Sequence, residues 1–443
     1  MPESLPFPLR PDQVEKMQLA IRSDFARRSL MFLEVLLFLV VVSWIARTYV
    51  ASVLAGKPTV KNLELAVKLD PGNADYHLIL GRAYQYNLEN VQPEKALEQL
   101  RRAVELNPYS PQCWLDLALA VEFQGKVSEA ETYLRQADFL APNIPGYQWP
   151  MANFYLLQGN VDEAFRHFKV VLAGTSQYDQ NVFGTAWKAS GDPDKILDEL
   201  IPRRLPTEFS YLYYLLAQQR FAEAQPVWKR ILSNPEKFAP QQSASYIDSL
   251  LNAHRPAEAY QVWRDLQSKG LIPNPAMGAE GNLLTNGDLE DELLNMGFGW
   301  RIASVEGVYA GLDTTTYHSP SHALLVQFSG KQNLDYRQVY QYVKVSPGRA
   351  YRLQAFMKSE NITTDSGPRL EVRDAYYPAA FEKFSEDLRG TTQGWTSLLL
   401  DFTTGPKTEL IVVGLARLPS RKLDNLVAGR VWLDDVRLTP LPK

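Results

Sequence analysis

The longest apolar stretch of the chain, Leu30–Ala46, contains one charged residue, Glu34. A helix buried in a soluble core would show polar positions at every turn, and Val35–Val42 shows none. The stretch and the residues after it approach the ~20 residues with which a helix crosses a bilayer. We therefore expect a transmembrane anchor helix over residues 29–50, preceded by a tail over residues 1–28.

Basic residues indicate the orientation of this anchor. Arg27 and Arg28 lie directly before the apolar stretch, and the positive-inside rule then places the tail in the cytoplasm and the bulk of the chain on the other side. The alternative is a cleaved signal peptide, for which Val53–Ala55 could serve as the cleavage site. Because residues 1–28 are longer than the short n-region of a signal peptide, we expect an uncleaved anchor.

Beyond residue 57 the apolar positions recur with a helical period, and the whole pattern repeats after the 34 residues that separate Pro111 from Pro145. An earlier copy begins at Ala74, and weaker copies continue to about residue 270. The positions that correspond are Ala118 and Ala152, Ala130 and Ala164, and Leu134 and Phe168. Trp114, Leu117 and Tyr155 occupy other apolar positions of the same pattern.

Small residues in this pattern let two antiparallel helices approach closely, and large residues fill the space between neighbouring pairs. Proline, as at Pro142, ends the second helix because it cannot continue the hydrogen-bond ladder. The pattern resembles the tetratricopeptide repeat (TPR) and covers about residues 57–270. The resemblance implies an all-α solenoid that binds a protein partner on its concave face, and such arrays are rarely catalytic.

Four aromatic residues of the repeats are candidates for such a partner-binding groove. They are Tyr147, Trp149, Phe183 and Trp187. The competing interpretation, which we favour for most of them, is packing between repeats, because aromatic side chains usually bury most of their surface.

Residues 271–281 are rich in turn-forming Gly and Pro and are expected to be a linker. After them the helical period disappears, and short apolar or alternating stretches indicate β-strands. The expected strands are Ala323–Phe328, Gln338–Val345, Ala350–Ser359, Arg369–Arg373, Thr396–Thr403, Glu409–Leu415 and Gly429–Thr439. Their number and spacing predict an antiparallel β-sandwich, so the fold class is multidomain, with an α-solenoid followed by an all-β domain over residues 282–443.

Four motifs occur in this domain in a fixed order: residues 282–290 (NLLTNGDLE), 318–326 (HSPSHALLV), 341–348 (QYVKVSPG) and 431–438 (VWLDDVRL). With them, residues 282–440 resemble the jelly-roll carbohydrate-binding modules related to families 4, 9 and 22. The resemblance implies a jelly roll. Glycan binding is implied less strongly, because related sandwiches without sugar activity share these framework motifs.

The resemblance also implies one structural calcium ion near the joined terminal strands. The matching residues are Glu290 and Asp435, with Asp288 and Asp434 as neighbours. Carboxylate oxygens are suitable calcium ligands. The alternative is that Asp288 caps a turn and Asp434 is solvated.

Sugar recognition needs exposed aromatic faces with polar neighbours. The candidates for glycan binding are Tyr336, Tyr340, Tyr342, Tyr376 and Tyr377. Tyr340 and Tyr342 are two residues apart on one strand, so their side chains share a face. The tryptophans Trp300, Trp395 and Trp432 are expected in the core instead.

Composition limits the remaining functions. Lys and Arg number 46 and Asp and Glu 50, a net charge of −4, which does not indicate a nucleic-acid-binding surface. Cys113 is the only cysteine, so the chain forms no internal disulfide and no cysteine-based metal cluster. We find no phosphate-binding or nucleophile motif and expect no enzyme, although a hydrolase with two carboxylates in one groove would be compatible with Glu382, Glu386 and Asp387.

These features together predict a non-catalytic scaffold of the bacterial cell envelope, anchored in the inner membrane with its bulk in the periplasm. Its repeats would bind protein partners and its jelly roll glycan, in exopolysaccharide or O-antigen assembly or export. The competing prediction is a purely structural subunit of a membrane complex that binds no glycan. An exposed tyrosine groove on the sandwich would favour the first, and tyrosines buried in an interface would favour the second.

Overall fold

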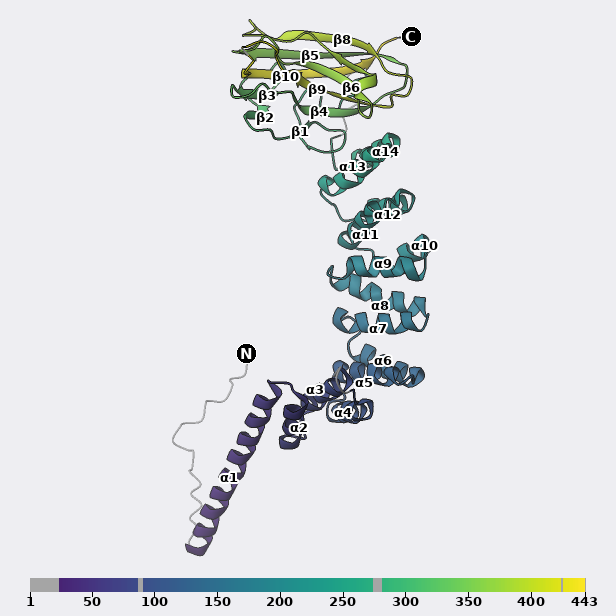
Figure 1. Cartoon of the computed structure of the whole chain (residues 1–443), viewed down its shortest axis with the longest axis vertical. Coiled ribbons are helices and arrows are strands. Elements are labelled where there is room, and N and C mark those ends of the chain that lie inside the picture. Colours follow the sequence, from purple (N-terminus) through teal and green to yellow (C-terminus); the bar gives the residue numbers. More distant parts are fainter. Residues whose placement is uncertain (1–23, 87–90, 274–280, 424, 443) are drawn as a thin grey trace, which may run out of the picture. The chain divides into compact units, whose positions relative to one another are not determined.

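The computed structural model describes residues 24–86, 91–273, 281–423 and 425–442. The chain divides into two compact units, Met1–Gly174 and Thr175–Lys443. The first contains an apolar helix and helical pairs, and the second contains further helices and a β-sandwich (Figure 1). Most of the predicted tail and of the linker over 271–281 lies outside the described residues.

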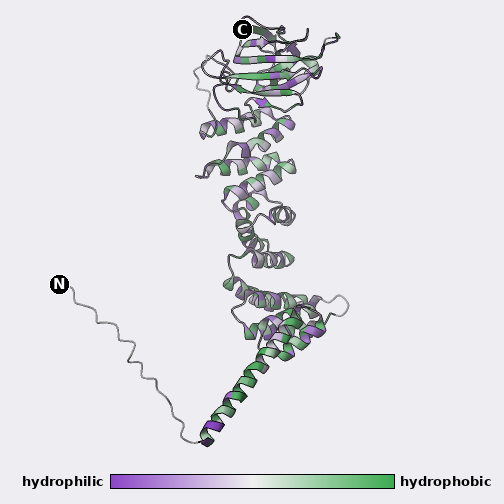
Figure 2. Cartoon of the chain, turned by 90° about the vertical axis from the view of Figure 1, so that its left-hand side faces the viewer, coloured by the Kyte–Doolittle hydropathy of each residue, from purple (hydrophilic) through white to green (hydrophobic). Residues whose placement is uncertain are grey.

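Helix α1 (Asp24–Ala55) is long and apolar enough to cross a membrane, and in Figure 2 most of its ribbon is coloured as hydrophobic. Its 32 residues measure about 48 Å at ~1.5 Å per residue, more than the ~30 Å hydrocarbon core requires. Near its end Ala51 is fully buried, and Ala55 packs against Leu63 of α2 (Val60–Leu69). The helix predicted over residues 29–50 therefore continues unbroken into the first helical pair of the array.

The remaining helices of the first unit form antiparallel pairs, as the 34-residue period predicts. The pairs are α3 with α4, α5 with α6, and α7 with α8. Their bounds are Ala74–Tyr86 (α3), Pro93–Leu106 (α4), Pro111–Phe123 (α5), Val127–Leu140 (α6), Pro145–Leu157 (α7) and Val161–Gly174 (α8).

Small residues bring the two helices of a pair together. Ala118, Ala130 and Ala164 are fully buried. At Gly81 of α3, a Cβ atom would lie 2.6 Å from Cγ of Leu100 in α4, so a larger residue would displace the Leu100 side chain. The sequence prediction that small residues mark close helix contacts is confirmed.

The second unit continues the helical pattern less regularly. Where the sequence shows a degenerate pair, the structure has α9, a three-residue helix and a π-helical turn. Regular pairs resume with α11–α12 and α13–α14. The bounds are Asp179–Ala189 (α9), Pro193–Lys195 (α10), Ile196–Leu200 (η2), Leu205–Ala217 (α11), Phe221–Ser233 (α12), Pro240–Ser243 (η3), Ala244–Asn252 (α13) and Pro256–Ser268 (α14).

The C-terminal part is a sandwich of two five-stranded antiparallel sheets, with strand orders β1-β4-β9-β6-β7 and β2-β3-β10-β5-β8. The fold-class prediction is confirmed, although the sequence did not indicate β1, β2 and β7. A short helix, η4 (Pro378–Ala380), precedes β7. The strands are Arg301–Ile302 (β1), Val308–Asp313 (β2), Ala323–Ser329 (β3), Tyr336–Lys344 (β4), Ala350–Glu360 (β5), Arg369–Asp374 (β6), Glu382–Phe384 (β7), Thr396–Thr403 (β8), Leu410–Arg417 (β9) and Ala428–Pro440 (β10).

The core lies between the two sheets and follows the strand alternation. Val339 and Val343 of β4 point into it together with Leu353 of β5 and Val413 of β9, while Tyr340 and Tyr342 lie on the opposite face of β4. Strand β9 is buried along its whole length, which is unusual for a sheet with one solvated face. Something therefore covers the outer face of the first sheet.

Candidate functional site

The outer face of the sheet β1-β4-β9-β6-β7 is the surface on which the sequence places most of the candidate tyrosines. The helical pair α13–α14 contacts this side of the sandwich. Trp263 of α14 is buried with its ring 6.2 Å from that of Phe298, and Tyr260 meets Phe298 edge-on at 5.2 Å. At Gly297, which has a φ of 54°, a Cβ atom would lie 2.6 Å from the Trp263 ring, so the contact is closely packed.

Polar and aromatic contacts extend this interface onto the tyrosines themselves. Nη2 of Arg301 lies 2.6 Å from Oδ1 of Asp248 in α13, and the Arg301 guanidinium lies 5.1 Å from the centre of the Tyr342 ring. His254, in the turn between α13 and α14, stacks on Tyr376 with ring centres 4.0 Å apart. Tyr377 meets the same His254 ring edge-on at 6.1 Å. Three of the five candidate tyrosines therefore contact the chain's own last helical pair or a side chain paired with it.

The five tyrosines do not form one exposed platform. Tyr336 is 1% exposed and packs in the core against Phe328, so its prediction as a glycan contact is wrong. Tyr340 and Tyr342 are half-buried and meet edge-on at 5.5 Å. Burial raises the pKa of Tyr376 to about 12. Tyr377, at 62% exposure, is the one of the five whose side chain is largely open to solvent.

The three tryptophans expected in the core differ among themselves. Trp300 and Trp432 are buried, as expected. Trp395 is only partly buried, and its ring meets that of His318 edge-on at 5.6 Å. The indole N–H of Trp432 donates to Asp313 of β2, in the same sheet.

Paired carboxylates do occur on the same sheet, but not in hydrolytic geometry. Glu371 of β6 and Glu382 of β7 both bind Nη1 of Arg337, the second at 2.7 Å. Burial raises the pKa of Glu371 despite this cation. Glycosidases hold their two carboxyl groups ~5–10 Å apart around a sugar, whereas these two share one guanidinium nitrogen. Glu386 and Asp387 do not join them.

The predicted calcium ligands are already engaged as hydrogen-bond acceptors. Glu290 accepts the backbone N–H groups of Ser321 and His322, each at 3.0 Å. Asp434 accepts those of His318 at 2.7 Å and Ser319 at 3.0 Å. In the described part of the chain, no three His, Cys, Asp or Glu side chains are arranged to hold a metal ion. This donor-lined setting does not fit a cation.

The other two predicted calcium ligands are Asp435 and Asp288. Asp435 lies 2.6 Å from Nδ1 of His318, and its φ of 48° belongs to the bulge at which β10 shifts register against β5. Asp288 is exposed. Glu290, Asp434 and Asp435 thus tie loops together by hydrogen bonds.

Calcium removal tests this interpretation. We expect the midpoint of thermal unfolding of the sandwich to stay unchanged when the full chain is moved from millimolar calcium into a chelator, because Glu290, Asp434 and Asp435 have protein partners. Differential scanning calorimetry measures it, with magnesium as the matched control. A calcium-specific rise in the midpoint would show that the family-implied ion binds after all.

The same hydrogen bonds predict an acid transition of the sandwich. Although burial acts in the opposite sense, the hydrogen bonds from Ser321 and His322 lower the pKa of Glu290 from 4.5 to about 2. The stability that Glu290 contributes is therefore complete above about pH 4.5 and is lost as the pH falls towards 2. When the free energy of unfolding is measured during acid titration, the Glu290→Gln variant should lack the loss of stability that Glu290 causes in the unaltered chain.

The predicted groove residues divide between the two units and are largely packing residues. In the first unit, Trp149 packs edge-on against Phe168 at 5.4 Å, and Tyr147 is half-buried. In the second unit, Phe183 is fully buried between Tyr211 and Tyr214, which contradicts its prediction as a groove residue. Trp187 is half-buried under the guanidinium of Arg220 at 3.9 Å.

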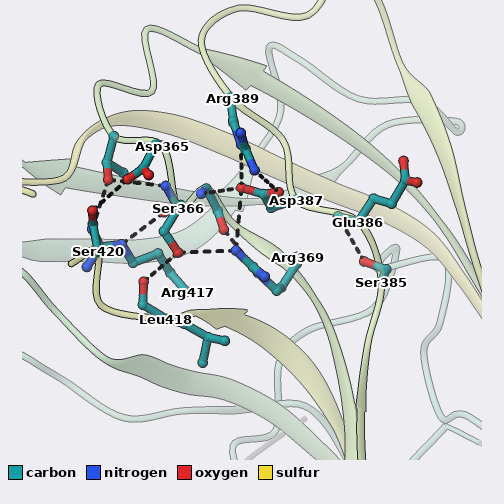
Figure 3. Close-up of polar contacts among 12 residues, drawn as sticks. Asp365, Ser366, Arg369, Ser385, Glu386, Asp387, Arg389, Arg417, Leu418 and Ser420 are labelled. Carbon is teal, nitrogen blue, oxygen red and sulfur yellow. Dashed lines mark hydrogen bonds and ion pairs between the residues drawn. The ribbon is translucent and has the colours of Figure 1, made fainter. Parts of the chain in front are cut away.

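One polar cluster was not predicted and lies at the end of the sandwich (Figure 3). Arg417 is fully buried there and donates to Ser366, Asn333, Leu334, Thr364 and Asn425. Beside it, Asp387 accepts the N–H of Gly367 at 2.7 Å and lies between Arg369 and Arg389. Asp387 therefore fixes a loop instead of facing solvent. The sequence signal that could have revealed this cluster is Arg417 itself, an arginine at the end of a continuous apolar strand.

Comparison with known protein families identifies one match, in the helical part of the chain. Residues 85–145 match the tetratricopeptide repeat family. No curated protein matches the chain. The TPR match lies within the helical pairs of the first unit, where the 34-residue period is most regular.

Solved structures resemble each part. The Pseudomonas aeruginosa pilF protein is 14% identical over 51% of this chain and 91% of its own, with a TM-score of 0.26. A structure reported as "CBM4 structure and function" is 12% identical over 36% and 99%, with a TM-score of 0.25. The enzymatically active domain of tailspike protein 4 of bacteriophage CBA120 is 15% identical over 36% of this chain, which spans 21% of that protein, with a TM-score of 0.25. At such values they indicate no function for this chain.

Proposed function

We propose that this chain is a non-catalytic scaffold that is anchored in the bacterial inner membrane by α1 and binds protein partners through its TPR array. In this proposal the β-sandwich caps the C-terminal end of the array. The periplasmic orientation follows from Arg27 and Arg28 before the anchor.

The observation that carries the proposal is the packing of α13–α14 against the sandwich. A helical array exposes an apolar face at its last pair and needs a capping element with a polar outer surface. Trp263, Phe298 and Tyr260 bury that face, and the Arg301–Asp248 ion pair borders it. Because the same contacts include Tyr342 and Tyr376, they favour the structural interpretation over glycan binding on this sheet.

Glycan binding at the exposed ring of Tyr377, at the border of the α13–α14 contact, is the second candidate. A role in exopolysaccharide or O-antigen assembly or export belongs to this candidate. It predicts that the full chain in detergent binds a glycan array and that Tyr377→Ala abolishes the binding.

A charge swap tests the capping role. We expect Arg301→Asp and Asp248→Arg each to speed amide hydrogen exchange in Ala244–Ser268 within the full chain, because each leaves two like charges facing each other. The double variant should restore protection, since it re-forms the pair with reversed polarity.

The matched control for this swap is Arg352→Asp, which breaks the exposed ion pair with Asp401 on the other sheet. It should leave exchange in α13–α14 unchanged. If neither Arg301→Asp nor Asp248→Arg changes amide hydrogen exchange in α13–α14, the capping role is contradicted.

A further inference from the structure

A cavity of about 310 Å³ opens between α10, the π-helical turn η2, α11 and α12, in the degenerate part of the repeat array. Its apolar walls are Pro193, Leu197, Pro226 and Val227. This volume is at the lower end of the range for ligand pockets and accommodates one long side chain.

Two irregularities of the backbone form this cavity. The π-helical turn Ile196–Leu200 supplies Leu197, and π-helical segments occur often at functional sites. Pro226 lies inside helix α12 and has no N–H group, so the carbonyl of Ala222 lacks its usual helical donor. Ala222 and Pro226 both line the cavity, which places a carbonyl in need of a donor at its wall.

A buried hydroxyl also lies at the cavity wall. Tyr211 is 1% exposed, and its hydroxyl lies beside the indole N–H of Trp187 without a hydrogen bond of ordinary geometry to any described residue. A ligand that donates a hydrogen bond to this hydroxyl oxygen therefore gains affinity.

The charged residues of the cavity wall have one sign. Asp194 and Glu223 line it, and no basic residue does. Arg220 lies 3.3 Å from one oxygen of Glu223, but its guanidinium is held over the Trp187 ring at 3.9 Å. The second Glu223 oxygen and the Asp194 carboxylate are acceptors for an incoming cation.

We propose that this cavity receives a basic side chain, lysine or arginine, presented by the protein partner of the array. The aliphatic walls would contact its methylene stem, and the two carboxylates and the Ala222 carbonyl would accept hydrogen bonds from its charged end. The proposal rests on the partner-binding function and names the chemistry that the partner must carry.

Small-molecule titration tests the site without knowledge of the partner. The full chain in detergent carries 3-fluorotyrosine at position 211 and is titrated with Nα-acetyl-lysine amide, followed by ¹⁹F NMR. We expect a saturable shift, with affinity for the uncharged analogue Nα-acetyl-norleucine amide weaker by about tenfold, equivalent to ~1.4 kcal/mol.

Variants link this preference to the carboxylates. The double variant Asp194→Asn/Glu223→Gln should bind the lysine and norleucine probes equally, and Asp198→Asn, on the same helical turn but outside the cavity, should retain the preference. No shift with the lysine probe, or equal affinity for both probes in the unaltered chain, would overturn the proposal. Neither result would affect hydrogen exchange in α13–α14, so failure of this site is distinguishable from failure of the capping role.

Discussion

Replacing Arg417 by methionine is expected to destabilise the β-sandwich by on the order of 3–5 kcal/mol. Arg417 is fully buried at the end of β9, and its guanidinium donates to five acceptors, among them the carbonyls of Leu334 and Asn425. Methionine fills a similar volume but leaves these buried oxygens without donors. The free energy of unfolding, measured by urea denaturation with a probe in the sandwich, tests the effect.

The position of the acceptors makes this effect larger than that of an ordinary ion pair. They belong to three separate segments, around Asn333, Ser366 and Asn425, which no strand pairing joins directly to one another. The control Arg421→Met removes an exposed arginine from the neighbouring loop and should change stability by less than ~0.5 kcal/mol. Equal, small effects of both variants would show that the buried guanidinium is dispensable.

Lowering the pH from 7 to 4.5 is expected to destabilise the helical array through His167. This side chain is 1% exposed in α8, and burial followed by the positive charge of Arg166 lowers its pKa from 6.5 to about 4. The unfolded chain binds a proton between these values and the folded one does not. Stability is therefore complete above about pH 6.5 and falls as the pH approaches 4, by on the order of 2–3 kcal/mol.

Hydrogen bonds explain why His167 stays neutral in the folded state. Arg166 donates to its Nε2 at 2.8 Å, so Nδ1 carries the proton and donates to Oε1 of Gln148. The ring also stacks on Tyr155 at 5.3 Å. Urea denaturation across this pH range gives the free energy of unfolding of the His167→Gln variant, which should lack the pH dependence that His167 contributes. A pH dependence equal to that of the unaltered chain would contradict the assignment.

Repetition made the helical half of the chain predictable. Ala118, Ala130, Ala152 and Ala164 recur at one period, and each is buried where two helices meet. The two failures of regularity, at η2 and at the end of α1, were not predictable in detail. One depends on a π-helical turn that has no sequence period, and the other on a long apolar helix that continues into the array.

The fold of the sandwich could be predicted from the sequence, but the covering of one of its faces by helices could not. Alternation along β4 correctly separates Val339 and Val343 from Tyr340 and Tyr342. It does not reveal that α13–α14, more than 70 residues earlier in the chain, covers part of that face. Tyr336 fails for a different reason, because the register between β4 and β9 shifts between Tyr336 and Val339 and the ring turns into the core.

Partners distant in sequence explain the remaining errors. His254 and Asp248 read as ordinary residues of a helical repeat, and Arg301 as the start of a strand. Only the folded chain brings them to Tyr376 and Tyr342. The calcium ion that the family resemblance implies stays a prediction. In the structure the backbone amides of Ser321 and His322 donate to Glu290, and those of His318 and Ser319 donate to Asp434.

Hydroxyl-radical footprinting of the full chain in detergent tests most directly whether the tyrosine face of the sandwich is a capped interface. Mass spectrometry gives the oxidation rate of each tyrosine. Tyr377 and Tyr309, 62% and 58% exposed, should be oxidised fast, and Tyr342 and Tyr376 slowly, with their rates rising in the Arg301→Asp variant. Oxidation of Tyr342 and Tyr376 as fast as that of Tyr377 in the unaltered chain would contradict the capping role and return this face to the candidates for glycan binding.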